Sequence, residues 1–320
     1  MIYDNIEQIN AIYERINKKN DDEYENRILK IYKKYPDLEE IRKKIIDFKV
    51  RIAKFNILND DKKVTKYQKE LDENILKYNQ SLKLYNLKES DFEKHYDCCD
   101  CKDTGFINGI KCHCYIDKEI SIYKKLSNFD NYDDILDRFS LNVYKQNIMS
   151  VETTSYFEYM VSKLSSIKEM ILEFKKFNKP INIFISGKTG TGKTFLSRFI
   201  GQSLLNIRKT VIHITVNDLM NAVFDSMSNN NKKRNILLDY IEDCDVLILD
   251  DLGKENVNDY SIRYIYNLID TRLNNKQSTI ICSQHNLTEI STIYDEGFTP
   301  RLYNYFFPIR LDGKDLRGIY

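Results

Sequence analysis

The sequence predicts an α/β domain built on a five-stranded parallel sheet, preceded by an α-helical region. Three observations lead to this prediction. Five short apolar segments alternate with helical patterns in the second half of the chain. A glycine-rich loop follows the first of these segments and opens a helix. Residues 1–104 contain no glycine and only one proline, Pro36, as expected of helices.

Composition narrows the class of protein. At 320 residues the chain is long enough for about two domains. A net charge of +1 disfavours a uniformly basic nucleic-acid-binding protein, although it is compatible with a local basic patch. Polar and charged residues follow Met1 closely, and no apolar run approaches the roughly 20 residues of a membrane span. The expected location is therefore the cytoplasm.

The N-terminal region, residues 1–94, shows helical periodicity. Apolar residues recur at steps of three and four in three runs, which are Ile2 to Ile16, Leu38 to Phe55 and Val64 to Tyr85. The turn-forming residues Asn59-Asp60-Asp61 separate the last two runs. We expect an antiparallel helical hairpin packed on earlier helices. Its apolar stripes form either the core of a bundle or, in part, a face that binds a partner.

A cysteine-rich module, residues 95–116, predicts a metal site. Two closely spaced pairs of cysteines occur there, namely Cys98 with Cys101 and Cys112 with Cys114. Four thiolates on two tight turns can complete a tetrahedral Zn²⁺ shell without an open position, so the zinc would be structural. Cys99 is an additional thiol, and His113 is an alternative ligand. Free or redox-active thiols are the competing interpretation. A charged linker and a lead-in segment, residues 117–150, come next.

A strand, a glycine-rich loop and a helix follow one another from Ile181 to Phe199, after a helix expected over residues 156–177. The loop consists of Gly187, Lys188, Thr189, Gly190, Thr191, Gly192, Lys193 and Thr194. In such a P-loop the glycines let backbone N–H groups point at phosphate oxygens, and the helix N-terminus strengthens this field. Lys193 would reach the β- and γ-phosphates, and the Thr194 hydroxyl would bind Mg²⁺. The loop therefore predicts a nucleoside triphosphate site.

Four further strands are expected, at residues 210–216, 245–249, 278–283 and 306–311. The strand at 245–249 ends in the paired acids Asp250 and Asp251, as a Walker B strand does. Asp250 would hold Mg²⁺, and Asp251 lies where a general base would orient the attacking water.

Three polar side chains and one loop in this half of the chain are further candidates. Gln284 follows the strand at 278–283 and would bring an amide near the γ-phosphate. Arg301 and Arg317 have the side chain best suited to bidentate phosphate contacts. The basic loop at residues 229–234 is either solvated or a contact for nucleic-acid phosphates.

Together these motifs resemble the bacterial replicative helicase loaders of the DnaC/DnaI family, which are AAA+ ATPases. Besides the P-loop, the resemblance rests on the run Asp250-Asp251-Leu252-Gly253-Lys254-Glu255, on Asp270-Thr271-Arg272 and on Gly313-Lys314-Asp315-Leu316-Arg317. The cysteine module resembles the zinc region of Gram-positive members. The resemblance covers about residues 91–320. P-loops and Walker B strands are widespread, whereas the cysteine motif combined with the Asp-Asp-Leu-Gly-x-Glu run is much more specific.

The resemblance implies an AAA+ ATPase domain at residues 151–320 that uses ATP and Mg²⁺, with Zn²⁺ in the cysteine module. Such a loader assembles on the replicative DNA helicase and helps to place it on single-stranded DNA, and the N-terminal and zinc regions would contact the helicase. Arg301 would be an arginine finger that reaches a neighbouring copy, and Arg317 would be a sensor arginine on the same chain. Gln284 stands where the family usually has asparagine, and Gly297 stands where an arginine is common.

The chain stops soon after Arg317, so no helical lid is expected, and the isolated protein should bind ATP weakly and hydrolyse it slowly. Two other functions stay open. An adaptor that senses ATP without needing hydrolysis is compatible with Asp251 and Gln284. A transposition helper ATPase would carry a similar AAA+ domain, but the cysteine cluster and the long helical N-terminal region argue against it.

Overall fold

The computed structural model describes residues 3–127, 129, 137, 140, 156–228, 236–255, 257–294, 297–313, 315 and 316. The chain divides into two compact units. One comprises Asn10–Cys112, and the other comprises His113–Tyr320 together with Met1–Ile9. The basic loop at 229–234 and the candidate sensor Arg317 lie outside the described residues.

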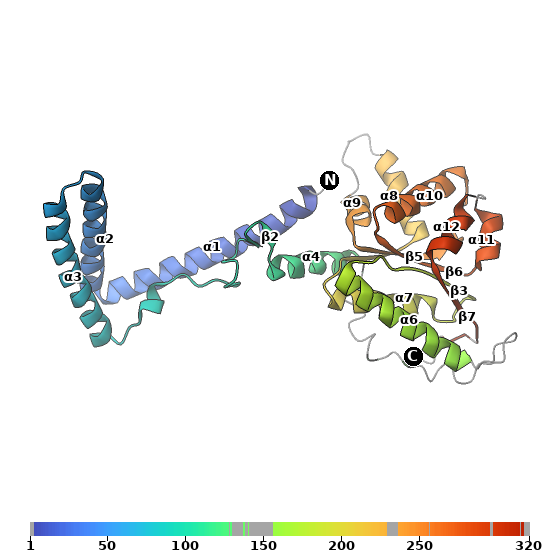
Figure 1. The fold of residues 1–320 in the computed structure, drawn as a ribbon, viewed down its shortest axis with the longest axis horizontal. Coiled ribbons are helices and arrows are strands. Elements are labelled where there is room, and N and C mark those ends of the chain that lie inside the picture. Colours follow the sequence, from blue (N-terminus) through green and yellow to red (C-terminus); the bar gives the residue numbers. More distant parts are fainter. Residues whose placement is uncertain are drawn as a thin grey trace. The chain divides into compact units, whose positions relative to one another are not determined.

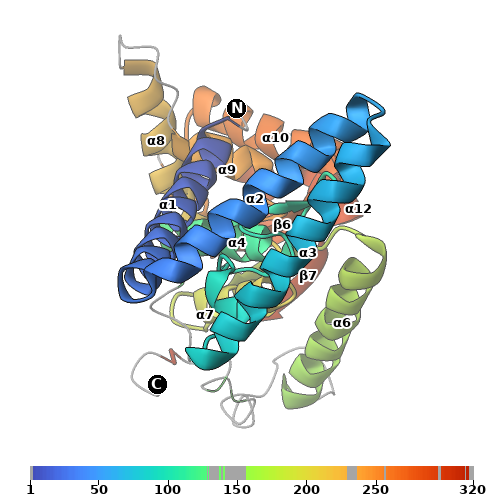
Figure 2. The ribbon, with the colours of Figure 1, turned by 90° about the vertical axis from the view of Figure 1, so that its left-hand side faces the viewer.

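The helical hairpin expected near the N-terminus is confirmed. The helices are α1 (Tyr3–Lys34), α2 (Pro36–Ile57) and α3 (Asp61–Leu84), followed by the short 3₁₀ helix η1 (Glu89–Phe92). Helices α2 and α3 lie antiparallel and side by side (Figures 1 and 2). Pro36 opens α2 at a position where its missing N–H has no helical partner to lose. The Asp60 side chain caps α3 by accepting a hydrogen bond from the backbone N–H of Lys63.

The apolar stripes of this hairpin form its own core. Leu38, Leu82 and Phe92 are buried together. Phe48 and Phe55 each pack a ring against Tyr67 of the opposite helix, at centroid distances of 6.2 and 5.7 Å. Of the two interpretations of the stripes, the structure supports the bundle core for these residues.

The second unit contains the predicted parallel sheet. Its strands are β3 (Asn182–Gly187), β4 (Val211–Thr215), β5 (Val246–Leu252), β6 (Ser278–Ser283) and β7 (Phe307–Leu311). They are arranged in the order β4-β5-β6-β3-β7, and every neighbouring pair is parallel. All five strands correspond to segments expected from the sequence, so the predicted fold class is confirmed.

Helices cover both faces of this sheet (Figure 1). They are α4 (His113–Leu126), α6 (Tyr156–Phe177), α7 (Lys193–Asn206), α8 (Val216–Ser228), α9 (Ile236–Asp243), α10 (Asp259–Asn274), α11 (Leu287–Ile293) and α12 (Phe298–Tyr305). Helices α6 and α7 pack on one face, and α8 to α12 pack on the other. Alternate residues of β5 therefore enter different cores. Leu247 and Leu249 pack under α8 to α12, and Val246 and Ile248 pack under α6 and α7. This explains why a strand such as β5 begins with a continuous apolar run, Val246 to Leu249, rather than alternating with polar residues.

The strand order brings the predicted motifs to one edge of the sheet. Strand β6 lies between β5 and β3, so the carboxyl ends of these three strands are adjacent. The P-loop follows β3, the paired acids end β5, and Gln284 follows β6. Ligands of open α/β sheets bind at this edge. None of the described helices is both long enough and apolar enough to cross a membrane.

Candidate nucleotide site and cysteine cluster

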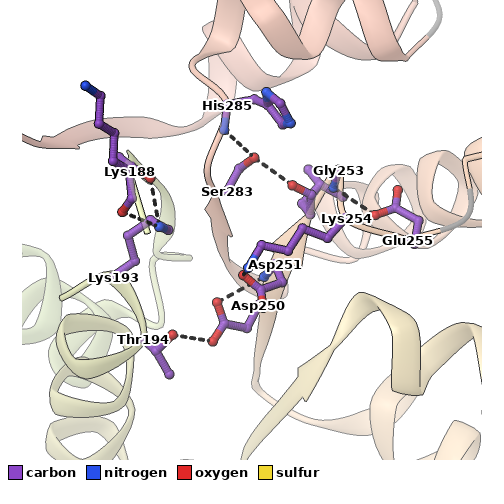
Figure 3. A network of polar contacts seen from close by, with 12 residues as sticks. Lys188, Lys193, Thr194, Asp250, Asp251, Gly253, Lys254, Glu255, Ser283 and His285 are labelled. Atoms are coloured by element: carbon purple, nitrogen blue, oxygen red, sulfur yellow. Dashed lines mark hydrogen bonds and ion pairs between the residues drawn. The ribbon is translucent and has the colours of Figure 1, made fainter. Parts of the chain in front are cut away.

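The glycine loop between β3 and α7 is curled, as the sequence predicts. Gly190 and Gly192 have φ angles of +83° and +95°, in the left-handed region that favours glycine. The Lys193 ammonium donates hydrogen bonds to the carbonyl oxygens of Gly187, at 2.7 Å, and Lys188, at 2.9 Å (Figure 3). Burial lowers the pKa of Lys193. Its ammonium is thus held inside the loop, where a phosphate would add a counter-charge.

The Walker B acid Asp250 faces this loop. The Thr194 hydroxyl donates a hydrogen bond of 2.7 Å to Asp250 Oδ2 (Figure 3). Burial of Asp250 opposes its ionisation, but the neighbouring His213 and the hydrogen bond from Thr194 outweigh that effect and lower the pKa below the ordinary value of 3.8. A hydroxyl and an ionised carboxylate side by side are the oxygen ligands that Mg²⁺ uses beside nucleotide phosphates. The residues present therefore fit a nucleotide-bound Mg²⁺.

A bulge at the end of β5 brings the second acid to the same edge. The pairing of β5 with β6 shifts register between Leu249 and Leu252. Asp251 lies within this shift and has a φ angle of +63°, which is unusual for a residue other than glycine. Its carboxylate forms an ion pair with Lys254 Nζ at 2.7 Å (Figure 3). Without the bulge, consecutive acids would point to opposite faces of the sheet.

The loop after β5 is held by the ends of neighbouring elements (Figure 3). The backbone N–H of Gly253 donates a 2.8 Å hydrogen bond to Glu255 Oε2, and the hydroxyl of Tyr294 also contacts the Glu255 carboxylate. Burial raises the pKa of Glu255. Ser283, at the end of β6, donates to the carbonyl of Leu252 at 2.7 Å. These contacts fix the segment beside the two acids. Gln284 is half-buried directly beyond Ser283, and its role as a sensor stays a prediction.

Arg301 binds residues of its own chain. It lies on α12, and its Nε donates a 2.6 Å hydrogen bond to Asp270 of α10. The guanidinium also lies over the ring of Tyr266, 4.6 Å from the centroid, and donates to the carbonyl of Gly297 at 3.2 Å. The predicted finger is therefore anchored at the surface between α10 and α12.

The four predicted cysteine ligands come together. The buried sulfur atoms of Cys98, Cys101, Cys112 and Cys114 all lie within 4.8 Å of one another. Cys98 Sγ and Cys112 Sγ are 3.8 Å apart. A tetrahedral shell with Zn–S bonds of about 2.3 Å has edges of about 3.8 Å, so this spacing is compatible with zinc. Cys99 is exposed and is not part of the four-cysteine group. His113 lies near Cys98 and Asp100 instead.

Asp103 supports this cluster, and the sequence analysis did not identify it. Its buried carboxylate accepts hydrogen bonds from the backbone N–H groups of Cys98, at 2.8 Å, and Asp97, at 3.0 Å. It also accepts a 2.9 Å hydrogen bond from the side-chain amide of Asn20 in α1. The two short strands β1 (Phe106–Ile107) and β2 (Ile110–Lys111) then form the hairpin that leads to the second cysteine pair. An acid two residues after a C-x-x-C pair was the available signal.

His213 was also missed. It lies within the apolar strand β4, and its Nε2 faces Asp250 Oδ2 at 3.5 Å. The signal was a single histidine in a run that is otherwise apolar from Val211 to Ile214. Sequence alone did not show that β4 is the neighbour of β5.

Known proteins resemble about half of the chain. The replicative helicase loader DnaC of Escherichia coli strain K12 is 29% identical over 145 residues, which cover 45% of this chain and 58% of DnaC. The chain thus spans little more than half of that relative's length. A solved structure of DnaI has 20% sequence identity and a TM-score of 0.43, and the alignment covers 57% of this chain and 92% of DnaI. A solved structure of the DnaC helicase loader has 19% sequence identity and a TM-score of 0.44, and the alignment covers 60% of this chain and 99% of that structure.

A family model described as "IstB-like ATP binding protein" matches residues 146–302. This range contains the P-loop, the paired acids, Gln284 and Arg301. The geometry of the loop and of Asp250 agrees with that description. This chain therefore contains an ATP-binding domain of the IstB/DnaC type.

Proposed function

We propose that this protein is an ATP-dependent loader that places a replicative DNA helicase on single-stranded DNA. The observation that carries the proposal is the similarity of its ATP-binding domain to the replicative helicase loader DnaC. The nucleotide site supports it, because the residues that would hold MgATP are present and face one another. The test is co-purification of the full chain with a bacterial replicative helicase, with and without ATP. We expect the helicase to co-purify in a manner that depends on ATP. Failure to co-purify both with and without ATP would contradict the proposal.

The site supports a defined division of labour. The P-loop N–H groups and Lys193 would bind the phosphates, while Thr194 and Asp250 would hold Mg²⁺. Bound Mg²⁺ would neutralise charge on the β- and γ-phosphates. Asp251, kept at the edge of the sheet by Lys254, would orient the attacking water and accept its proton. Hydrolysis by the isolated protein is expected to be slow, so a turnover above about ten per second would contradict this expectation.

Arg301 is proposed to complete the ATP site of a neighbouring copy. There its guanidinium would bind phosphate oxygens, either while it keeps its ion pair with Asp270 or after it has released that partner. Two inactive variants test this, Lys193→Ala and Arg301→Ala. Mixing them should restore part of the ATPase activity, because one variant supplies an intact P-loop and the other an intact finger. If the mixture is as inactive as its components, Arg301 does not act in trans.

Exposed apolar side chains at the start of α10 and the end of α8 are the proposed contact for single-stranded DNA. The rings of Phe224 and Tyr260 lie 5.6 Å apart, and the Tyr260 hydroxyl contacts Met227 Sδ at 3.2 Å. All three side chains are exposed. Aromatic faces of this kind stack on bases, with about 1–3 kcal/mol lost per base on truncation to alanine. Tyr260→Ala should therefore weaken oligonucleotide binding by at least about fivefold. Tyr303→Ala, at an exposed position of α12, is the matched control.

The cysteine cluster is proposed to hold one structural Zn²⁺ through Cys98, Cys101, Cys112 and Cys114. This module and the N-terminal helices would form the helicase-binding region. Metal analysis of the purified chain should give about one zinc per chain, and less than about half would contradict the site.

Two alternatives remain testable. A transposition helper ATPase would share this type of domain, and retention by a transposase rather than by a helicase would establish it. An adaptor that only senses ATP would still load and recycle normally as the Asp251→Asn variant. A loader that needs hydrolysis would stall after loading in that variant.

A further inference from the structure

His213 occupies an unusual position for a polar side chain. Its side chain is only 5% exposed although β4 is an edge strand of the sheet, and the Asp250 side chain beside it is equally buried. Nε2 lies 3.5 Å from Asp250 Oδ2. Nε2 is buried, and among the residues that the structure describes it makes no contact with full hydrogen-bond geometry; its approach to Asp250 is at ion-pair distance. A buried nitrogen without a well-formed hydrogen bond is costly, so its orientation toward the Walker B acid requires an explanation.

The register of the sheet explains why these two side chains meet. His213 of β4 pairs with Ile248 of β5, and Asp250 lies two residues further along β5. Residues two apart on a strand share a face, so His213 and Asp250 are diagonal neighbours on one face of the sheet. Thr215, the residue of β4 that pairs directly with Asp250, donates its hydroxyl to Asp218 at 2.7 Å instead.

The segment after α4 holds the imidazole in place. The backbone N–H of His213 donates a 3.0 Å hydrogen bond to Ser127 Oγ, which in turn donates to the carbonyl of Val211 at 3.3 Å. The ring of Phe129 meets the imidazole edge to face, with a centroid distance of 6.2 Å and an interplanar angle of 80°. Both Ser127 and Phe129 are buried. Ser127 therefore holds the backbone of His213 and Phe129 packs against its ring, while Nε2 faces the nucleotide site.

We propose that His213 is a positioning residue for Asp250, whose carboxylate it holds in the orientation needed to bind Mg²⁺ together with Thr194. The proposal rests on the ATP-binding function and deepens it. In the tautomer with hydrogen on Nε2, the imidazole donates toward Oδ2, the oxygen that Thr194 also contacts. A carboxylate with two fixed donors loses less rotational freedom when a metal arrives. The same ring is too buried to bind the nucleotide itself.

Binding of a fluorescent ATP analogue to the full chain, measured during a MgCl₂ titration and again with EDTA, tests this role. His213→Phe keeps a planar ring and removes the donor, whereas His213→Gln places an amide nitrogen near the position of Nε2. His213→Asn has the same amide but is too short to reach Asp250. Ile214→Val, at the neighbouring buried position, controls for small packing changes. Thermal unfolding without nucleotide or metal reports the stability of each variant.

Loss of a hydrogen bond to a metal-binding side chain typically costs tenfold or more in metal affinity. His213→Phe and His213→Asn should therefore raise the Mg²⁺ concentration for half-maximal binding about tenfold, with nucleotide affinity in EDTA unchanged. His213→Gln should return it to within about threefold of the original protein. If His213→Phe unfolds, the test rests on the difference in Mg²⁺ dependence between His213→Gln and His213→Asn.

Two results would overturn the proposal. One is a Mg²⁺ dependence in His213→Phe equal to that of the original protein, and the other is equal loss in the glutamine and asparagine variants. Failure of the proposed ATP-binding function looks different. In that case the unmodified chain would show no Mg²⁺-dependent binding of the analogue, or Lys193→Ala would bind it equally well.

Discussion

Arg272 offers a sharp test of how the ATP-binding domain is held together. Its side chain is 1% exposed, although it carries a full charge. The guanidinium donates to the carbonyl oxygens of Ser278, at 2.7 Å, Ile241, at 3.0 Å, and Cys244, at 3.1 Å, and to Thr279 Oγ1 at 3.2 Å. One side chain at the end of α10 thus binds the end of α9 and the start of β6. Replacing Arg272 by methionine should destabilise the domain.

The size of the effect follows from the acceptors left behind. A buried carbonyl that loses its donor costs about 1–3 kcal/mol. Four carbonyls are affected, one of them (Asp245) only through a long contact of 3.5 Å, but some will find other donors, and methionine fills part of the volume with apolar atoms. The expected loss is therefore about 3–5 kcal/mol. For a domain of this size that corresponds to a fall in Tm of roughly 10 °C.

Urea and thermal unfolding of the full chain, followed by circular dichroism, measure this loss. Arg263→Met is the matched control, because Arg263 lies on the same helix but is exposed. Arg272→Lys should fall between the two, since lysine keeps the charge but not the planar set of donors. A difference below about 1 kcal/mol between Arg272→Met and Arg263→Met would refute the reasoning.

Three further outcomes are expected. Gly190→Ala should abolish binding of a fluorescent ATP analogue, because φ is +83° there and a Cβ would lie 2.1 Å from Asp315 Oδ1; retained affinity would show that the loop adapts. Cys112→Ser should lose zinc while Cys99→Ser keeps it, as measured by metal analysis, and equal zinc content would place the site elsewhere. The pKa of Glu255 is raised by burial above 4.5, so protonation favours the folded state and stability falls as pH rises through the raised pKa. Glu255→Gln should remove this dependence, so parallel Tm curves for the two proteins from about pH 4 to about pH 7 would contradict the assignment.

Some of the nucleotide site could be predicted because its signal is local. The P-loop is a run of eight consecutive residues, Gly187 to Thr194, and spacing alone determines which glycines take the left-handed conformation. The paired acids come directly after the apolar run of β5, and the bulge that contains them spans only the residues between Leu249 and Leu252. Each feature depends on neighbours along the chain, so one sequence is enough to place it.

Arg301 shows where such reasoning stops. The sequence marks it as a candidate for phosphate contacts, but its observed partner is Asp270, 31 residues away on another helix. Arg272 was noted only as part of a motif, and its burial depends on how α9, α10 and β6 meet. Neither partnership leaves a pattern in the residues next to the arginine.

The amino-acid sequence by itself determined the five strand segments along the chain, the phosphate-binding loop, the Walker B acids and the two cysteine pairs, because periodicity and short spacings encode them. Only the tertiary structure decided that His213 faces Asp250, that Asp103 supports the cysteine cluster, and that Arg272 is buried. The physical reason is that strand order and helix packing bring together residues distant in the chain, and burial then gives those contacts their strength.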